Sequence, residues 1–236
     1  MRQPRRHVLT ALGIVGVFAL AACGDAGYPA TYVENRPTAA AYGQHGAEEG
    51  GSTGESGATV ATGKLVNAQG GDVGTVTLSE GDAGINVVVN AHGLEPGFKG
   101  LHVHSVGKCE GQSAAPDNPS QTGAFLSAGG HLAGQGAQHG QHAGDLPSLL
   151  VGDNGNASLT TNSNLTSDLL FDGDGSALVV HSGPDNFANV PQRYAANGPD
   201  QETKNTGDSG TRVACAVLEQ TEGAGSGEAT AGGAGH

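Results

Sequence analysis

The pattern of apolar and polar positions predicts short β-strands in the middle of the 236-residue chain. Seven runs are rich in β-branched residues, alternate in part between apolar and polar positions, and are separated by Gly, Asn or Asp: residues 58–66, 73–80, 84–94, 99–106, 155–162, 175–182 and 211–219. Alternation with turn residues between the runs is typical of antiparallel strands that bury one face. Seven or eight such strands predict an all-β sandwich or barrel over residues 58–221.

Two gaps between the predicted strands are too long for hairpin loops, at about residues 108–148 and 183–210. Irregular segments of this length inside a compact domain usually carry function. We therefore look for chemistry in these two loops first.

The two ends of the chain have a different composition from the middle. Residues 1–22 hold three arginines and then an apolar run, which is typical of a signal peptide, and "LAAC" before Cys23 resembles a bacterial lipobox. Residues 23–57 predict a flexible tether that starts at the lipid-modified Cys23, and residues 222–236 predict a disordered Gly/Ala tail. We expect an exported protein that a lipid anchors to the outer face of the cell membrane.

Charge narrows the choice of partners. Removal of residues 1–22 leaves 7 basic and 23 acidic residues, a formal net charge of −16. Such a surface repels phosphate backbones, so we expect no nucleic-acid partner, and membrane contact only through the N-terminal lipid. Oligomeric state is left open by the sequence, and a homodimer is possible.

Three cysteines are informative in an exported protein. With Cys23 used by the lipid, Cys109 and Cys215 remain, and an oxidising compartment makes a disulfide their simplest arrangement. The alternative is a pair of unpaired buried thiols.

Histidines gather around the two long loops. His102 and His104 are two residues apart in a β-prone run, so their side chains leave the same face of the strand. His131, His139, His142 and His181 lie in or next to the long loops, and Asp145 follows His142 at the same spacing that separates His139 from His142. A lone histidine is more often a satisfied surface or core residue than a ligand. Six histidines together with an aspartate at a matching spacing favour a copper or zinc site.

Five motifs in order make the chain similar to one family. "GLEPGFKGLHVHSVGKC", "FLSAGGH", "HAGDLPSL", "ALVVHSGPDN" and "GDSGTRVACAV" resemble the successive motifs of copper/zinc superoxide dismutases, most of all the exported lipoprotein forms of actinobacteria. The resemblance covers about residues 58–220. It implies a Greek-key fold of about eight strands and an enzyme that converts superoxide to O₂ and H₂O₂ through Cu(II)/Cu(I) alternation.

The resemblance also implies a role for individual residues. It assigns copper to His102, His104, His131 and His181, and zinc to His131, His139, His142 and Asp145. His131 would bridge the two metals and supply a proton, and Arg212 would guide the anion beside the copper. Asp185 would hydrogen-bond one histidine of each site, as outer carboxylates do to fix ring orientation. Cys109 and Cys215 would form the family disulfide.

The chain departs from the family pattern in the zinc loop. Fewer residues separate His139 from His142 than is usual, although both histidines and Asp145 are kept. The 183–210 loop resembles the family's electrostatic loop and carries Glu202, Lys204 and Asp208; for Lys204 a solvated surface charge is an equal alternative.

Two other functions compete with the enzyme. One is a non-enzymatic copper- or zinc-binding lipoprotein, which would need neither His131 nor Arg212, and the other is a surface interaction protein on a bare β-sandwich.

Overall fold

A computed structural model describes residues 57–82, 84–134 and 138–221 of the chain. The expected signal peptide, Cys23, nearly all of the tether and the tail lie outside these residues. Within the described part, no helix combines the length and apolar character that crossing a bilayer requires.

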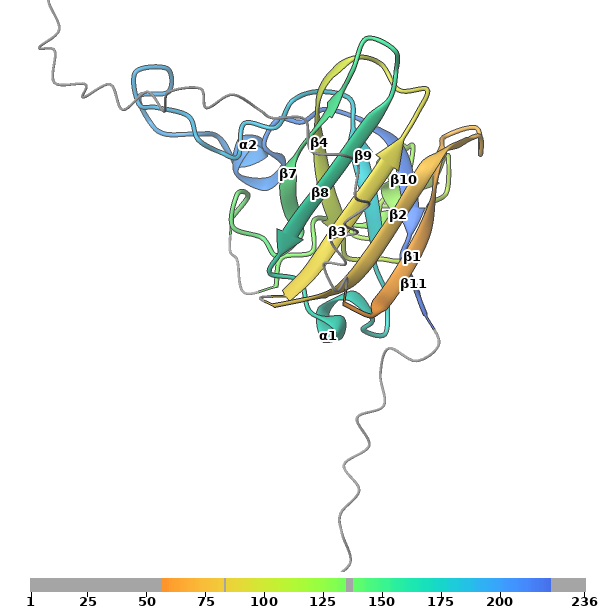
Figure 1. Cartoon of the computed structure of the whole chain (residues 1–236). Helices are drawn as coiled ribbons and strands as arrows, with labels where there is room; N and C mark the ends of the chain where they lie inside the picture. The colour runs from red at the N-terminus through yellow and green to blue at the C-terminus, as the bar shows by residue number, and fades with distance from the viewer. Residues whose placement is uncertain (1–56, 83, 135–137, 222–236) are drawn as a thin grey trace, which may run out of the picture. The chain divides into compact units, whose positions relative to one another are not determined.

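One large sheet contains nearly all of the strands (Figure 1). Its members are β1 (Thr59–Asn67), β2 (Asp72–Gly81), β3 (Gly84–Ala91), β4 (Gly97–His104), β7 (Asp145–Val151), β8 (Ala157–Ser163), β9 (Ala177–His181), β10 (Arg212–Val217) and β11 (Glu219–Gln220). A separate hairpin pairs β5 (Ser113–Ala114) with β6 (Thr122–Gly123). The helical turns are η1 (Leu126–Ala128), α1 (Ser167–Leu170) and α2 (Gln201–Thr206).

The strands follow the order β7-β4-β9-β10-β1-β2-β3-β8, and each neighbouring pair is antiparallel. The first and last members of this order, β7 and β8, also contact each other, so the sheet nearly closes into a barrel. β1, β2 and β3 are neighbours both in the sequence and in the sheet, whereas the next pair in the sequence, β3 and β4, lies far apart in this order. The all-β barrel expected from the sequence is confirmed.

The barrel interior is apolar and explains why the histidines of β4 face outward. Fully buried side chains from all around the sheet fill it: Leu65, Leu78, Val87, Leu101, Val103, Leu149, Leu178 and Val180. Since strand side chains alternate, Leu101 and Val103 inside place His102 and His104 on the outer face of β4. That face is nevertheless buried, because the long loops cover it.

Strand β7 was not predicted, and the first long loop is therefore shorter than expected. The sequence placed a loop up to residue 148, but β7 begins at Asp145. Pro147 hid this strand, because proline cannot donate a ladder hydrogen bond. The β4–β7 register shifts between Lys99 and Leu101, and no pairing is made at Pro147. The second long segment, 183–210, also contains a short helix, α2.

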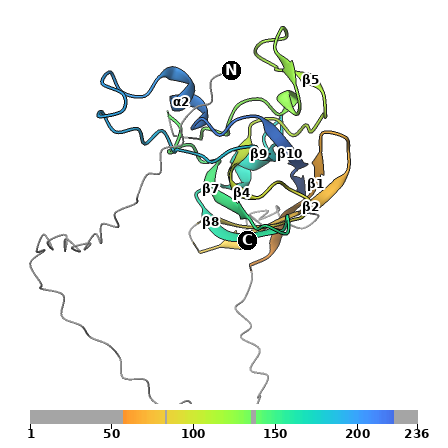
Figure 2. The same ribbon diagram turned by 90° about the horizontal axis from the view of Figure 1, so that it is seen from above.

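Both long segments lie outside the barrel, on the side of β9 and β10 (Figure 2). The segment after β4 is tied to the sheet by a disulfide between Cys109 and Cys215, with the two Cα atoms 5.6 Å apart. The pairing expected from the cysteine count is confirmed.

Candidate metal centre

Three of the candidate ligands come from neighbouring strands. His102 and His104 lie on β4 and His181 ends β9, which pairs with β4. The ring centroids of His102 and His104 are 6.4 Å apart, and both side chains are fully buried. Strand geometry thus sets the spacing of these rings before any loop is added.

Backbone carbonyls orient two of the three rings. His104 donates from Nδ1 to the carbonyl of Gly129 over 2.9 Å, and His181 donates from Nδ1 to the carbonyl of Gly210 over 3.1 Å. A carbonyl only accepts, so the proton sits on Nδ1 and each Nε2 keeps its lone pair. These two Nε2 atoms are 3.4 Å apart.

The ring of His102 has the opposite orientation. Its Nε2 donates to Asp185 Oδ2 over 2.8 Å, and its Nδ1 is buried without a hydrogen-bond partner among the described residues. An orphaned buried nitrogen is costly unless something occupies it, and a metal ion would do so. With His131 added, four rings each offer a nitrogen within 4.8 Å of the other three.

Burial keeps these rings neutral at neutral pH. Desolvation lowers the pKa of His104 well below its ordinary value, and it lowers the pKa of His181 to about 3 and that of His131 to about 4. Desolvation also lowers the pKa of His102, although its hydrogen bond to Asp185 opposes the shift. Neutral imidazole is the form that binds copper or zinc, so the donor set fits such an ion.

A second donor set surrounds the carboxylate of Asp145, which stands at the start of β7. Its Oδ1 atom lies 3.1 Å from Nδ1 of both His131 and His139 and 3.3 Å from Nδ1 of His142. Backbone N–H groups of Gly140 and His142 hold the other oxygen, at 2.6 and 3.0 Å. Three imidazoles and one carboxylate are a common zinc set.

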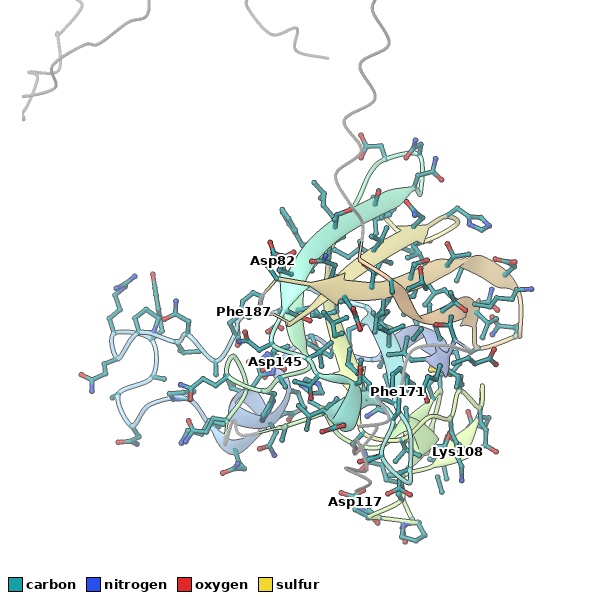
Figure 3. The ribbon with its side chains drawn as sticks, turned by 60° about the horizontal axis from the view of Figure 1, so that its bottom comes forward. Asp82, Lys108, Asp117, Asp145, Phe171 and Phe187 are labelled. Carbon is teal, nitrogen blue, oxygen red and sulfur yellow. A yellow bond between two sulfur atoms is a disulfide. The ribbon has the colours of Figure 1, made fainter. Side chains whose placement is uncertain are left out.

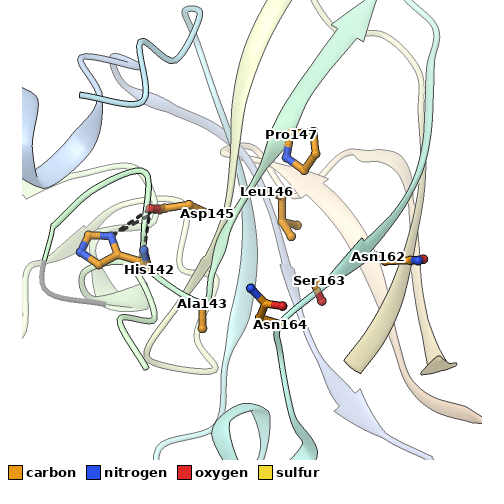
Figure 4. Close-up of a pocket in the computed structure, with 8 residues that line it drawn as sticks. All are labelled: His142, Ala143, Asp145, Leu146, Pro147, Asn162, Ser163 and Asn164. Atoms are coloured by element: carbon orange, nitrogen blue, oxygen red, sulfur yellow. Dashed lines mark hydrogen bonds and ion pairs between the residues drawn. The ribbon is translucent and has the colours of Figure 1, made fainter. Parts of the chain in front are cut away.

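Each of the three predicted zinc histidines contacts Asp145, but the four predicted donors do not form one tight group. His142 lies outside the tightest group, in which His102, His131, His139 and Asp145 offer donor atoms within 4.8 Å of one another. Figure 4 shows the bonds between His142 and Asp145 and the residues that line a neighbouring pocket, Asn164 among them. This pocket of about 210 Å³ is lined by residues at the start of β7 and the end of β8.

Asp185 joins the two sets. Besides accepting from His102, it accepts from Nε2 of His139 through Oδ1 over 2.7 Å. Oδ1 of Asp185 also accepts a hydrogen bond from the backbone N–H of Phe187 over 2.7 Å. The placement is the one that the sequence motif suggested for this carboxylate.

The segment 183–210 holds His139 in further ways. The backbone N–H of His139 donates to the carbonyl of Lys204 over 2.9 Å, and the ring of Phe187 stacks on the imidazole with centroids 6.3 Å apart. Figure 3 shows Phe187 and Asp145 on the same side of the domain. Gly207 packs directly against Asp185 and His139, because a Cβ at this position would overlap Asp185 Oδ1 and His139 Nε2. Phe187 lies outside the quoted motifs, and Gly207 lies in "GDSGTRVACAV" without having been given a role.

The charges of this second set differ from those of the first. Desolvation opposes the charged form of His139, but hydrogen bonds to Asp145 and Asp185 outweigh it and raise its pKa to about 9. Despite desolvation, hydrogen bonds from histidines hold the pKa of both carboxyl groups well below the usual range. Without metal, a proton on His139 offsets only one of the two carboxylate charges, so the set keeps a net negative charge.

An open channel of about 870 Å³ leads to the first set and is lined by His131, His181 and Arg212. Arg212, which pairs with His181 across β10 and β9, donates from Nη1 to the carbonyl of Phe125 and from Nη2 to that of Gly129, each over 2.6 Å. Burial lowers the pKa of Arg212 to about 10, so its charge persists at neutral pH.

Other charges at the channel are acidic. Glu202 and Asp208 line it, while Lys204 does not and its neighbour Asn205 does. Lys99 lies in a quoted motif but was given no role; it is buried and donates from Nζ to the carbonyl of Ser182 over 2.8 Å, next to His181.

Comparison with known proteins points to one family. The profile described as copper/zinc superoxide dismutase matches residues 72–218. A copper-zinc superoxide dismutase of Mycolicibacterium paratuberculosis is 45% identical over 148 residues, which cover 60% of this chain and 65% of that protein. One of Mycobacterium tuberculosis is 44% identical over 172 residues, with coverages of 70% and 67%. The chain thus spans about two thirds of the length of these relatives.

Solved structures agree with the sequence relatives. The copper/zinc superoxide dismutase of Brucella abortus is 29% identical with a TM-score of 0.53, covering 67% of this chain and 98% of that one. A double mutant of a SOD-like protein from Bacillus subtilis is 31% identical with a TM-score of 0.54, covering 69% and 99%. With the barrel and the two donor sets, these matches establish that the chain belongs to the copper/zinc superoxide dismutase family.

Proposed function

We propose that this protein is a superoxide dismutase that uses copper held by His102, His104, His131 and His181. The observation that carries the proposal is the convergence of four neutral imidazoles, two of which, His131 and His181, line an open channel together with Arg212. A protein that only stores metal needs the rings but has no use for a cation beside an open approach.

Bound copper would supply the electron transfer: one superoxide is oxidised to O₂, and another takes up an electron and two protons to give H₂O₂. The chain's own residues bind and orient the anion and supply a proton. His131 belongs to both donor sets, its Nδ1 contacts Asp145, and the residue lines the channel; these observations support its ring as the group that would hold that proton.

Arg212 provides the local attraction that the overall charge does not. The acidic surface of this chain repels an anion only weakly at distances beyond about 8–10 Å in physiological salt, because counterions screen it. A fixed guanidinium inside a channel acts at short range and focuses the field inward. Arg212 is therefore the residue that guides superoxide over the last few ångströms.

The second donor set, His131, His139, His142 and Asp145, is proposed to hold zinc. Two carboxylates and one protonated histidine leave this site with a net negative charge, and a divalent ion that displaced the proton from Nδ1 of His139 would neutralise it. Zinc there would fix the orientation of the His131 ring.

The test uses the full chain, purified and reconstituted with copper and zinc. We expect one copper and one zinc per chain and superoxide turnover that depends on copper. Arg212→Gln is expected to lower kcat/KM severalfold and to flatten its dependence on ionic strength while metal content stays unchanged. Full copper loading without turnover would instead support the non-enzymatic metal-binding protein.

Export and lipid anchoring at Cys23 complete the proposal and rest on the sequence of residues 1–23 alone. Expressed in an actinobacterial host, the wild type is expected in the membrane fraction and Cys23→Ser in the soluble exported fraction. Equal partition of the two proteins would contradict the anchor. A homodimer is tested by sedimentation of the purified chain at several concentrations.

A further inference from the structure

Phe125 has an unusual backbone for a bulky residue. Its φ of 58° and ψ of 20° lie in the left-handed region, where residues with large side chains are rare. It is also one of the largest fully buried side chains among the described residues. Strain of this kind persists only where the surrounding structure enforces it, and such positions cluster at functional sites.

The conformation turns the carbonyl of Phe125 toward Arg212. Phe125 precedes the 3₁₀ turn η1, and Gly129, with φ of 74°, follows it. Each of the two flanking residues accepts one hydrogen bond from the guanidinium, over 2.6 Å from Nη1 and Nη2. The turn thus forms a two-carbonyl cradle that fixes both ends of the planar group.

The same cradle reaches the first metal set. The carbonyl of Gly129 accepts from His104 Nδ1 as well as from Arg212. A displacement of the turn would therefore move the guanidinium relative to a ring of the copper set, and not only relative to solvent.

The ring of Phe125 holds the cradle in place. It packs in a small cluster with Ala177 and Val179 of β9 and Cys215 of β10, and Cys109 of the disulfide lies against the same cluster. The backbone N–H of Phe125 donates to the carbonyl of Glu110 over 2.9 Å. Apolar burial on the outer face of the sheet is what offsets the strained backbone.

We propose that Phe125 is a positioning residue for Arg212, which acts by anchoring the turn whose carbonyls hold the guanidinium. The proposal rests on the guiding role proposed above for Arg212. In this proposal, an apolar side chain that touches neither metal nor substrate determines how precisely the guanidinium of Arg212 is positioned in the channel.

The experiment is a double-mutant cycle on the metal-loaded full chain: wild type, Phe125→Ala, Arg212→Gln and the double variant. The readouts are kcat/KM, its slope against ionic strength, and copper and zinc content. We expect Phe125→Ala to lower kcat/KM about 5-fold and to flatten the salt dependence, and to add little once Arg212 has been replaced. Phe125→Leu keeps an apolar anchor and is expected to restore most of the rate.

Leu78→Ala is the matched control, because it truncates a fully buried side chain that belongs to the barrel interior and not to the cluster around Phe125. It is expected to lower stability and leave the salt slope unchanged. If Phe125→Ala does not fold, Phe125→Gly takes its place in the cycle, because glycine removes the ring and adopts the left-handed conformation without strain.

The outcomes separate the two proposals. The positioning role alone would be overturned if Phe125→Ala lowered kcat/KM by the same factor with Arg212 present and with Arg212 replaced. It would also be overturned if Phe125→Ala kept the wild-type slope of kcat/KM against ionic strength. An Arg212→Gln variant with wild-type rate and salt slope would remove the guiding role, and the positioning role with it.

Discussion

The two donor sets share His131 but are built from different parts of the fold. The first takes its other rings from β4 and β9, adjacent strands whose hydrogen-bonded register fixes their spacing. The second takes His139 and His142 from a loop, and the segment 183–210 braces His139 through a carboxylate, a backbone carbonyl and an aromatic ring. One set is rigid because of its strands, and the other depends on the docking of a second loop.

The sharpest way to separate the two sets is to remove one ring from each. His181→Ala deletes a strand-held donor and is expected to abolish copper binding and reduce superoxide turnover at least about 100-fold, with zinc content near one per chain. The matched variant His142→Ala is expected to lose zinc and keep copper. Metal analysis after exhaustive dialysis measures both. Loss of both metals in either variant would show that the sets do not fold independently.

Loss of the disulfide is expected to have the next largest effect, on stability, because the bond ties the loop that carries His131 to the sheet. Its closure over a sequence separation of 106 is worth about 4–5 kcal/mol in the chain-entropy model. Cys215→Ser should lower the free energy of unfolding by an amount of this order, measured by denaturant titration. Cys109→Ser should match it, and the double variant should add nothing further. An unchanged unfolding midpoint would contradict this role.

Asp185→Asn tests the brace between the sets. The amide can accept in place of only one of the two oxygens, so one histidine loses its partner. We expect zinc affinity to fall about 10- to 100-fold and copper affinity to fall less, because His102 remains fixed on β4 while His139 does not. Competition with a chromophoric chelator gives both constants. Equal losses for the two metals would remove the distinction between a strand-held and a loop-held set.

This distinction also explains what the sequence predicted well. The runs that became β1, β2, β3, β4, β8, β9 and β10 were visible because a barrel strand needs alternating apolar residues, and "HVH" within such a run placed two rings on one face. The strand β7 was missed because Pro147 masks the pattern, and only its tertiary pairing with a shifted β4 makes the proline tolerable.

Within the site, the donors were predictable and their supports were not. Histidine and aspartate are common metal ligands, so residue type alone suggested a metal site. The order of the motifs then assigned each of these residues to the copper or the zinc set. Lys99, Phe125 and Gly207 act through a carbonyl, a backbone conformation or the absence of a side chain. All three residues lie within the quoted motifs, but their roles depend on which segments meet in space, so residue type alone did not reveal them.

The smallest expected effect is the most specific test of how the loops interlock. Gly207 ends α2 with φ of 61°, and an added Cβ would overlap Asp185 Oδ1 and His139 Nε2. Gly207→Ala should therefore displace the Asp185–His139 hydrogen bond and weaken zinc binding severalfold, while copper binding on the strands stays within about 2-fold of the wild type.

Backbone strain alone must be separated from this contact, because alanine is unfavourable at any positive φ. Gly198 provides the control: it lies in the same segment with φ of 78°, and a Cβ there would meet nothing within 4 Å. Gly198→Ala should lower stability slightly and leave zinc affinity unchanged. If both variants weakened zinc equally, the loss would come from loosening the whole segment. If neither did, His139 would hold its metal without the contact between the two loops, and the loop-built set would be as self-sufficient as the strand-built one.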